Sequence, residues 1–165
     1  MDFLRDFLYS IPIPMWLKVF FASMIPFIEA RYAILFFVDM GIPFWELFAI
    51  SVLGNMVPIP FIILLFRPIV NWLLSTKYLN KFGQKLDEIA TEKAKKLNKI
   101  EGLGLFLFVA IPIPGTGAMS GALAATILKM RISRALPIIL SGTIVATLIT
   151  TGALEFISKA LEIFL

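Results

Sequence analysis

The amino-acid sequence predicts an all-α polytopic membrane protein built from two inverted repeats, each a re-entrant helical hairpin followed by a transmembrane helix. Three observations support this fold class. The composition is strongly apolar, two of the four apolar segments are interrupted by proline and glycine, and a basic amphipathic helix joins the halves. The predicted single membrane domain spans 1–165, with repeat 1 over about 16–66, the linker over about 68–101 and repeat 2 over about 102–157.

The composition excludes several classes of protein. Hydrophobic residues make up 59% of the chain, charged residues make up 16%, and the mean hydropathy is +0.93. An average soluble domain is roughly 45–50% apolar and about 25% charged. These values argue against a soluble enzyme, a disordered chain or a coiled coil. The chain also contains no Cys and no His, so it lacks thiolates, the commonest metal ligand and the usual general base. We therefore expect no catalytic residue, no metal and no cofactor.

Four apolar segments lie at roughly 19–38, 42–66, 103–128 and 135–157. A helix needs about 20 apolar residues to cross a bilayer, and the second and fourth segments fit full crossings. The first is interrupted near Pro26–Arg31 and the third near Pro112–Gly117. Proline removes a backbone donor and glycine lets the chain reverse. Because broken backbone at membrane depth needs protein or a cavity around it, both segments are predicted to be re-entrant hairpins.

The charged residues predict the orientation. The loop at 39–46 carries two acids and no base, whereas the loop at 129–134 carries three bases and no acid. The segment 67–101 holds eight of the fifteen basic residues. Basic residues accumulate in cytoplasmic loops, so both basic segments are expected at the cytoplasmic face of the inner membrane, which requires the third segment to enter and return. The apolar surroundings of the basic segment argue against a nucleic-acid partner.

The two halves resemble each other. Ile25-Pro26 precedes Ile111-Pro112 by 86 residues. Three further pairs align at an offset of 90: Met40 with Met130, Ile42 with Ile132, and Ser51 with Ser141. Each half then has an odd number of crossings, which puts the repeats in opposite orientation and predicts a binding site where the broken helices meet. Chance similarity between apolar segments is the alternative.

The linker is predicted to be helical. Between Thr76 and Ile100, apolar residues recur at steps of three and four, and lysines fill the other face. Such a helix either lies on an anionic leaflet or packs on the protein itself. The spacing of apolar residues over 154–164 indicates a short interfacial tail.

The strongest candidate for function is the Glu29-Ala30-Arg31 stretch. Charged side chains at membrane depth are costly and usually face a cavity. At a proline-led break both side chains can point into one cavity, where Glu29 would exchange a proton and the planar guanidinium of Arg31 would bind phosphate or carboxylate. The alternative is a mutual ion pair that only holds the hairpin together.

The second candidate is the uncharged stretch from Ile111 to Ala125. It offers unpaired backbone amides, which bind anions at a broken helix end, and hydroxyls; its small residues alternatively serve only close helix packing. In the first crossing, Asn55 would bind a ligand or join two helices. The complete set of predicted substrate- or ion-binding residues is Glu29, Arg31, Asn55, Pro112, Pro114, Gly115, Thr116, Gly117 and Ser120.

These motifs make the chain similar to the DedA-like superfamily of membrane proteins (also called SNARE-associated or VTT proteins), and within it to the small multidrug export proteins. The similarity rests on Ile-Pro-Phe-Ile-Glu-Ala-Arg at 25–31 and Pro-Ile-Pro-Gly-Thr-Gly at 112–117. It implies two facing re-entrant hairpins, movement of lipids such as undecaprenyl phosphate between leaflets, and proton-dependent drug tolerance. Glu29 matches the acidic residue of the first hairpin, and Arg31 matches the nearby arginine. The second hairpin of many DedA proteins carries arginine, whereas Leu103 to Leu128 has no charge here.

The leading functional hypothesis is a transporter of a lipid phosphate, a phospholipid or another amphipathic anion, possessing no enzymatic activity. Arg31 would hold the head group, and protonation of Glu29 would weaken or release it. A scramblase would need no proton coupling and only a polar groove for the head group. The alternatives are export of small molecules or drugs, and a structural or assembly factor that packs against other membrane proteins. The expected partners are membrane lipids, the anion and protons, and a homodimer is compatible with so short a chain.

Overall fold

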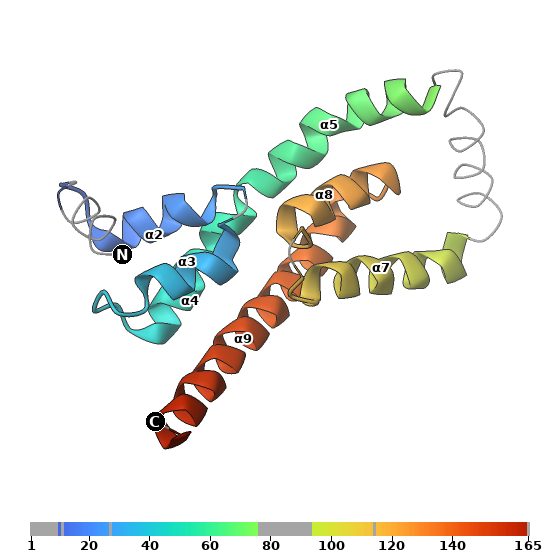
Figure 1. Ribbon diagram of the computed structural model, residues 1–165. Coiled ribbons are helices and arrows are strands. Elements are labelled where there is room, and N and C mark those ends of the chain that lie inside the picture. The colour runs from blue at the N-terminus through green and yellow to red at the C-terminus, as the bar shows by residue number, and fades with distance from the viewer. Residues whose placement is uncertain (1–9, 11, 27, 76–93, 114, 165) are drawn as a thin grey trace.

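The protein is described by a computed structural model that places residues 10, 12–26, 28–75, 94–113 and 115–164 (Figure 1). Within these ranges every regular element is a helix, which confirms the all-α class. The helices in chain order are α2 (Met15–Ser23), α3 (Glu29–Phe37), α4 (Phe44–Met56), α5 (Pro58–Ser75), α7 (Ala94–Ala110), α8 (Ala118–Ile127) and α9 (Ile132–Phe164).

Two pairs of helices are joined by short turns. Helices α2 and α3 pack against each other on either side of the turn at Pro26, and α7 and α8 do so on either side of residues 111–117. In Figure 1, α2 and α7 approach the middle of the molecule from opposite ends, and α3 and α8 lead back. The helices end where the prolines begin: α7 stops at Ala110, ahead of Pro112. We call the two pairs the first and second helical hairpin and their turns the tips.

Two stretches are long and apolar enough to cross a membrane, as the composition predicted. They are Phe44–Ile69, of 26 residues, and Ile132–Ala153, of 22 residues. Only 39% and 33% of their most apolar windows are buried within the structure, so most of this apolar surface faces outwards, unlike the core helix of a soluble protein. The first stretch is interrupted at Val57, between α4 and α5, where Pro58 begins the second helix because proline is accommodated in a first turn.

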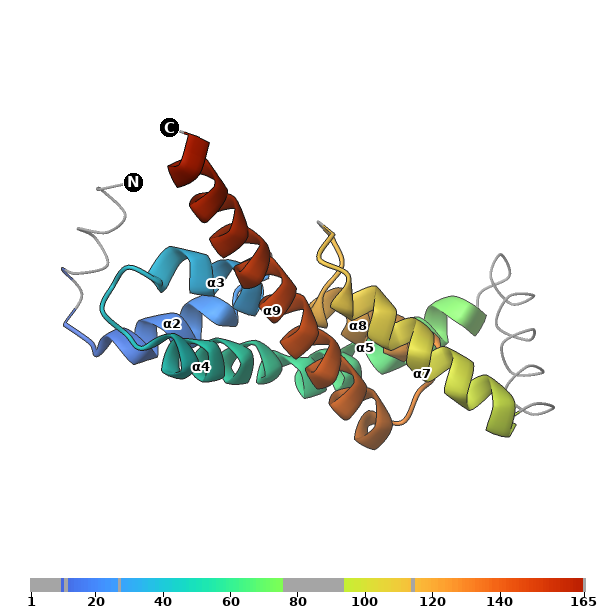
Figure 2. The same ribbon diagram turned by 90° about the horizontal axis from the view of Figure 1, so that it is seen from below.

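The two hairpins are packed in parallel ways. Helix α4 contacts both helices of the first hairpin, and its continuation α5 contacts α8 of the second hairpin. Helix α9 contacts both helices of the second hairpin and also α3 of the first. Figure 2 shows α9 crossing the molecule between the two groups. Each long stretch therefore supports one hairpin and covers part of the other.

Close approach of helices depends on one glycine in each long stretch. A Cβ on Gly54 would meet the backbone carbonyl of Phe20 in α2, and a Cβ on Gly142 would lie 3.2 Å from the backbone carbonyl of Phe106 in α7. Phe106 follows Phe20 by 86 residues, which is the offset between Ile25-Pro26 and Ile111-Pro112. At both positions a side chain would collide with a helix of the hairpin, with the Phe20 backbone in one case and with Val109 and the Phe106 carbonyl in the other.

The packing forms two apolar clusters. The buried residues of the first lie between the first hairpin and α4: Val19, Ile34, Phe37 and Leu47. The second lies among α5, the second hairpin and α9, with Ile59, Ile63, Leu105, Val109 and Ile139 among its members. Arg67 on α5 donates a 2.6 Å hydrogen bond to the backbone carbonyl of Met130, which ties α5 to the turn between α8 and α9.

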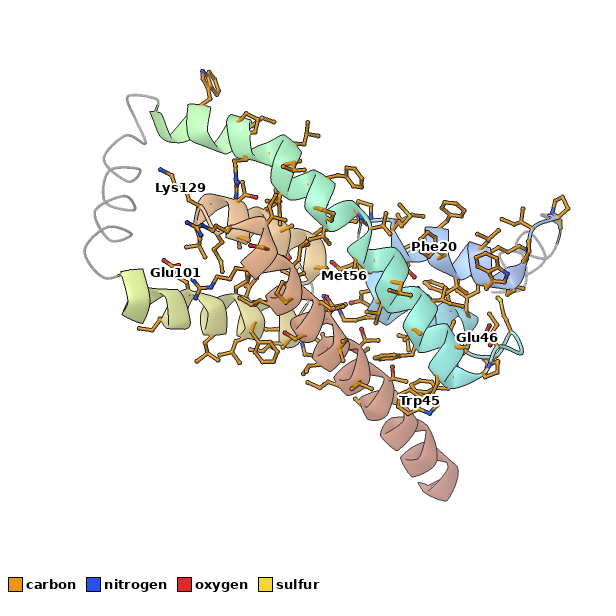
Figure 3. The ribbon with its side chains drawn as sticks, turned by 180° about the vertical axis from the view of Figure 1, so that it is seen from behind. Phe20, Trp45, Glu46, Met56, Glu101 and Lys129 are labelled. Atoms are coloured by element: carbon orange, nitrogen blue, oxygen red, sulfur yellow. The ribbon has the colours of Figure 1, made fainter. Side chains whose placement is uncertain are left out.

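The charged ends of the molecule lie apart. Figure 3 shows Trp45 and Glu46 at one end and Glu101 and Lys129 at the other. The start of α7 and the basic turn before α9 therefore share one end. This arrangement is the one expected if the second hairpin enters and returns on the same side.

Three boundaries differ from the sequence expectations. Helix α5 continues to Ser75 and α7 begins at Ala94, so both ends of the predicted linker belong to these helices; its middle, 76–93, lies outside the described residues. The predicted interfacial tail is the end of α9, which runs unbroken to Phe164. The first break ends before Glu29, so Glu29 and Arg31 lie in the first turn of α3 rather than in the break itself.

Candidate functional site

The two charged residues of the first hairpin are buried at its tip. Glu29 is the first residue of α3 and is 8% exposed, and Arg31 follows in the same turn and is 5% exposed. Burying a charge is costly unless it is paired and hydrogen-bonded. The start of a helix carries a partial positive charge, which suits the carboxylate of Glu29.

The pair neutralises itself and also joins the two hairpins. A guanidinium nitrogen of Arg31, Nη2, lies 2.8 Å from Oε2 of Glu29. The same nitrogen donates to the backbone carbonyl of Thr116, in the tip of the second hairpin. The ion pair proposed as one alternative from the sequence is therefore present, and it does more than hold the first hairpin together because Arg31 reaches across to the second.

A glycine makes room for this contact. Gly117 is buried, and a Cβ there would collide with both carboxylate oxygens of Glu29 and with Nη2 of Arg31. Its φ of +157° with ψ of −166° is also a conformation that side chains rarely permit. Position 117 thus requires glycine for two reasons: its backbone conformation, and the lack of room for a side chain beside the ion pair.

The backbone at Glu29 is itself unusual. Its φ is +49°, in the left-handed region that residues other than glycine seldom occupy. Such conformations persist where the surroundings hold them and cluster at functional sites. Here the ion pair and the helix start hold Glu29 in place.

The second tip is stabilised by the Thr116 hydroxyl. Its Oγ1 lies 2.8 Å from the carbonyl oxygens of both Ile111 and Ile113 and accepts a 3.3 Å hydrogen bond from the backbone N–H of Ile113. These bonds hold the turn that follows the end of α7 at Ala110. They leave the Thr116 carbonyl directed at Arg31.

A partly open pocket of about 540 Å³ lies between the two hairpins. Its polar lining side chains are Glu29, Arg31, Thr116 and Ser120. The walls are apolar and are formed by Pro26, Ile28, Tyr32, Phe36, Ile113, Met119 and Leu123. Several of these wall residues are also exposed on the outer surface: Tyr32, Phe36, Ile113 and Leu123. A pocket with apolar walls and an ion pair in its lining fits an amphipathic molecule whose polar group reaches that pair.

The structure brings together most of the residues selected from the sequence. Five line the pocket: Glu29, Arg31, Gly115, Thr116 and Ser120. Gly117 lies directly against the ion pair. Pro112 is exposed and Asn55 is buried in α4, and neither lines the pocket. Pro114 lies outside the described residues.

The apolar walls were missed by the sequence analysis. Tyr32 and Phe36 are four apart on α3, and Met119 and Leu123 are four apart on α8. Residues at this spacing share a helix face. The spacing would have identified them only if the starts of α3 and α8 had been known, because the face depends on where each helix begins.

The carboxylates of the described residues form no group of three that would suit a metal ion. The site instead offers one ion pair, backbone carbonyl and hydroxyl groups, and an apolar wall. This set of groups can bind a charged head group and release it by exchanging partners.

Comparison with known proteins places the chain in a family. The family described as "Putative small multi-drug export protein" matches residues 29–149, a stretch that begins at Glu29 and includes the second tip. Neither a curated protein nor a solved structure matches the chain.

Proposed function

Because the chain belongs to the family of small multi-drug export proteins, we propose that it is a membrane exporter that moves amphipathic anions through the pocket between the two hairpins. The observation that carries this proposal is the buried Glu29–Arg31 pair in the lining of a largely apolar pocket. An arginine fork binds phosphate or carboxylate with two parallel hydrogen bonds.

The same pair supplies a switch. Arg31 is occupied by Glu29 and by the Thr116 carbonyl, so an arriving anion must displace both. A proton on Glu29 would remove its charge and leave only the Thr116 carbonyl for the anion to displace from Arg31. This reverses the sign expected from the sequence: protonation favours anion binding, and loss of the proton restores the ion pair and expels the anion. Proton and anion would then be carried together, in the same direction.

The proposed membrane arrangement is two inverted repeats with re-entrant hairpins. It is supported by the matching glycine contacts of Gly54 and Gly142, and by α2 and α7 entering from opposite ends (Figure 1). In such transporters the broken helices of the two repeats meet at the substrate site. The end that holds Lys129 and the start of α7 would face the cytoplasm.

Lipid phosphates are a second candidate class of substrate. The pocket walls Tyr32, Phe36 and Leu123 are also exposed on the outer surface. Acyl or prenyl chains would then lie along these residues while the phosphate reaches Arg31. The similarity to DedA-like proteins points to the same class. We propose no covalent chemistry in either case, because binding and release by Arg31 and Glu29 suffice.

The deciding experiment measures transport in proteoliposomes with and without a pH gradient. The probes are a fluorescent amphipathic organic anion, a labelled phospholipid and a labelled polyprenyl phosphate. Wild type is compared with Glu29→Gln and Arg31→Gln. The matched controls are Glu46→Gln and Arg131→Gln, which remove the same charges at exposed positions outside the pocket.

We expect both pocket variants to lose transport while both controls retain it. Transport of the organic anion driven by the pH gradient identifies an exporter, and gradient-independent movement of a lipid identifies a scramblase. Rates equal to those of empty liposomes for all three probes would overturn the proposal and leave an assembly or structural role.

A further inference from the structure

The carboxylate of Glu29 occupies a closely bounded position between the two hairpins. Its Oε2 lies 2.8 Å from Nη2 of Arg31. Both carboxylate oxygens lie against Gly117, where an added Cβ would collide with them. Gly117 directly precedes α8, which has no acidic residue in its own first turn, and the start of a helix favours negative charge. A side chain of the first hairpin therefore fills a position for an anion that both hairpins form.

The charge at this position matches a carboxylate. Among the described residues that line the pocket, Arg31 is the one cation and Glu29 the one acid. One carboxylate balances one guanidinium, whereas a phosphate monoester carries a charge of about −1.5 to −2 near neutral pH. The excess negative charge would be buried without a partner, which is costly. The Thr116 carbonyl, which accepts a hydrogen bond from the same guanidinium nitrogen, would also repel further anionic oxygens.

The available space also matches a carboxylate. A carboxylate is planar and has two oxygens, whereas a phosphate group places three free oxygens around phosphorus and is wider. The group that bounds the Glu29 carboxylate on one side is the backbone of Gly117, which has no side chain that could turn away. A wider group beside Arg31 would therefore require the tip of the second hairpin to move.

Resting on the proposed export function, we propose that the Glu29 carboxylate is an internal stand-in for the head group of the substrate, and that the substrates are amphipathic carboxylates. The carboxylate of the substrate would take the position beside Arg31 and Gly117 when a protonated Glu29 gives it up. The apolar part of the substrate would lie against the pocket walls, which include Tyr32 and Phe36. This assignment selects carboxylates from the anions that an arginine can bind.

The test vacates the position and fills it with a small anion. Glu29→Gly removes the carboxylate, and glycine suits the φ of +49° at this residue. The melting temperature of the purified full-length variant is measured in detergent at constant ionic strength and neutral pH. Sodium formate, acetate and phosphate are each titrated against sodium chloride. A ligand that binds only the folded state raises the melting temperature. We expect formate and acetate to raise it saturably, and phosphate to raise it no more than chloride does.

Three further proteins assign this effect to the position beside Arg31. Wild type should not respond, because Glu29 already fills the position. The double variant Glu29→Gly with Arg31→Gln should lose the response, because the cation is gone. Glu46→Gly is the matched control, since it removes an exposed glutamate from the first turn of α4; it should not respond to carboxylates either.

Recovery of folded Glu29→Gly in acetate but not in chloride would support the proposal as the thermal shift does. If the variant is recovered in none of these salts, wild type with hexanoate or hexyl phosphate decides, and hexanoate should raise the melting temperature more. Equal melting temperatures in formate, acetate and chloride would overturn the proposal. So would a phosphate response that equals the carboxylate response, a response that survives Arg31→Gln, or equal effects of hexanoate and hexyl phosphate on wild type.

The result can be separated from the test of export. A carboxylate response in a protein that transports none of the probes would retain the binding site and overturn the export function. Transport that depends on Glu29 and Arg31, without a carboxylate response, would retain the export function and overturn the assignment of the substrate class.

Discussion

Arg31 on α3 donates a hydrogen bond to the backbone carbonyl of Thr116, 85 residues further along the chain. The nitrogen that makes this bond also makes the 2.8 Å ion pair with Glu29. One guanidinium therefore connects the charge of the first hairpin to the backbone of the second. Loss of charge at Glu29 is therefore expected to alter the contact between the hairpins.

The ion pair can be separated from a purely structural role by a double-mutant cycle. Glu29→Gln or Arg31→Gln alone leaves one buried charge unpaired, and we expect a loss of about 3–5 kcal/mol in the free energy of unfolding. The double variant should recover much of this loss, because no unpaired charge remains. Denaturant titration in detergent measures all four proteins.

Transport measured on the same four proteins completes this test. If the double variant is stable and inactive, the pair has a role in transport. If it is stable and transports normally, the pair serves only to hold the hairpins together.

Gly117→Ala should disrupt the tip contact without changing any charge. The added Cβ would collide with the Glu29 carboxylate and with Arg31, and we expect a loss of about 1–3 kcal/mol from overpacking. Gly104→Ala in α7 is the matched control, because nothing lies within 4 Å of its added Cβ. It should be neutral or gain up to about 1 kcal/mol. Thermal unfolding of the two variants side by side checks this prediction, which fails if Gly117→Ala melts at the wild-type temperature.

Gly54→Ala and Gly142→Ala should have similar effects if the halves are structurally equivalent. A Cβ at either position meets backbone or Cβ atoms of the neighbouring hairpin, which cannot move aside as a flexible side-chain end can. We expect each variant to lose about 1–3 kcal/mol, whereas Gly152→Ala, with open space around it, should not. The measurement is the melting temperature, and an effect in only one half would argue against equivalence.

The re-entrant arrangement can be tested with single cysteines, because the chain contains none of its own. Ile13→Cys and Glu46→Cys lie before and after the first hairpin. Ile100→Cys lies at the start of the apolar part of α7, and Arg131→Cys follows α8. A membrane-impermeant thiol reagent should label the first two from one side of sealed vesicles and the last two from the opposite side. The cysteine-free parent gives the background. If the two members of a pair are labelled from opposite sides, that segment crosses the membrane fully.

Much of the fold was predictable because helix breaks are local. Helix α7 ends two residues before Pro112, since a proline acts on the backbone beside it. The two long apolar stretches were predicted from composition for the same reason. The start of α3 was less accurately predicted. The break was expected to reach Arg31, whereas α3 begins at Glu29, whose own backbone has a positive φ.

The candidate site was predicted in part. Glu29 and Arg31 stood out because charge is rare in an apolar segment, and Thr116 and Ser120 because they accompany the second break. Asn55 was grouped with them for its polarity, yet it is buried in α4 and does not line the pocket. Polarity indicates that a side chain needs a partner and does not say which one.

The sequence by itself determined the helical segments, their interruptions and the rarity of charge within them, because each depends on residues close together along the chain. Only the tertiary structure decided that Arg31 meets the Thr116 carbonyl, that Gly117 makes room for Glu29, and which faces of α3 and α8 form the pocket walls. These relationships join segments more than 80 residues apart. They depend on how whole helices pack, and a backbone carbonyl has no side-chain signature by which the sequence would reveal it.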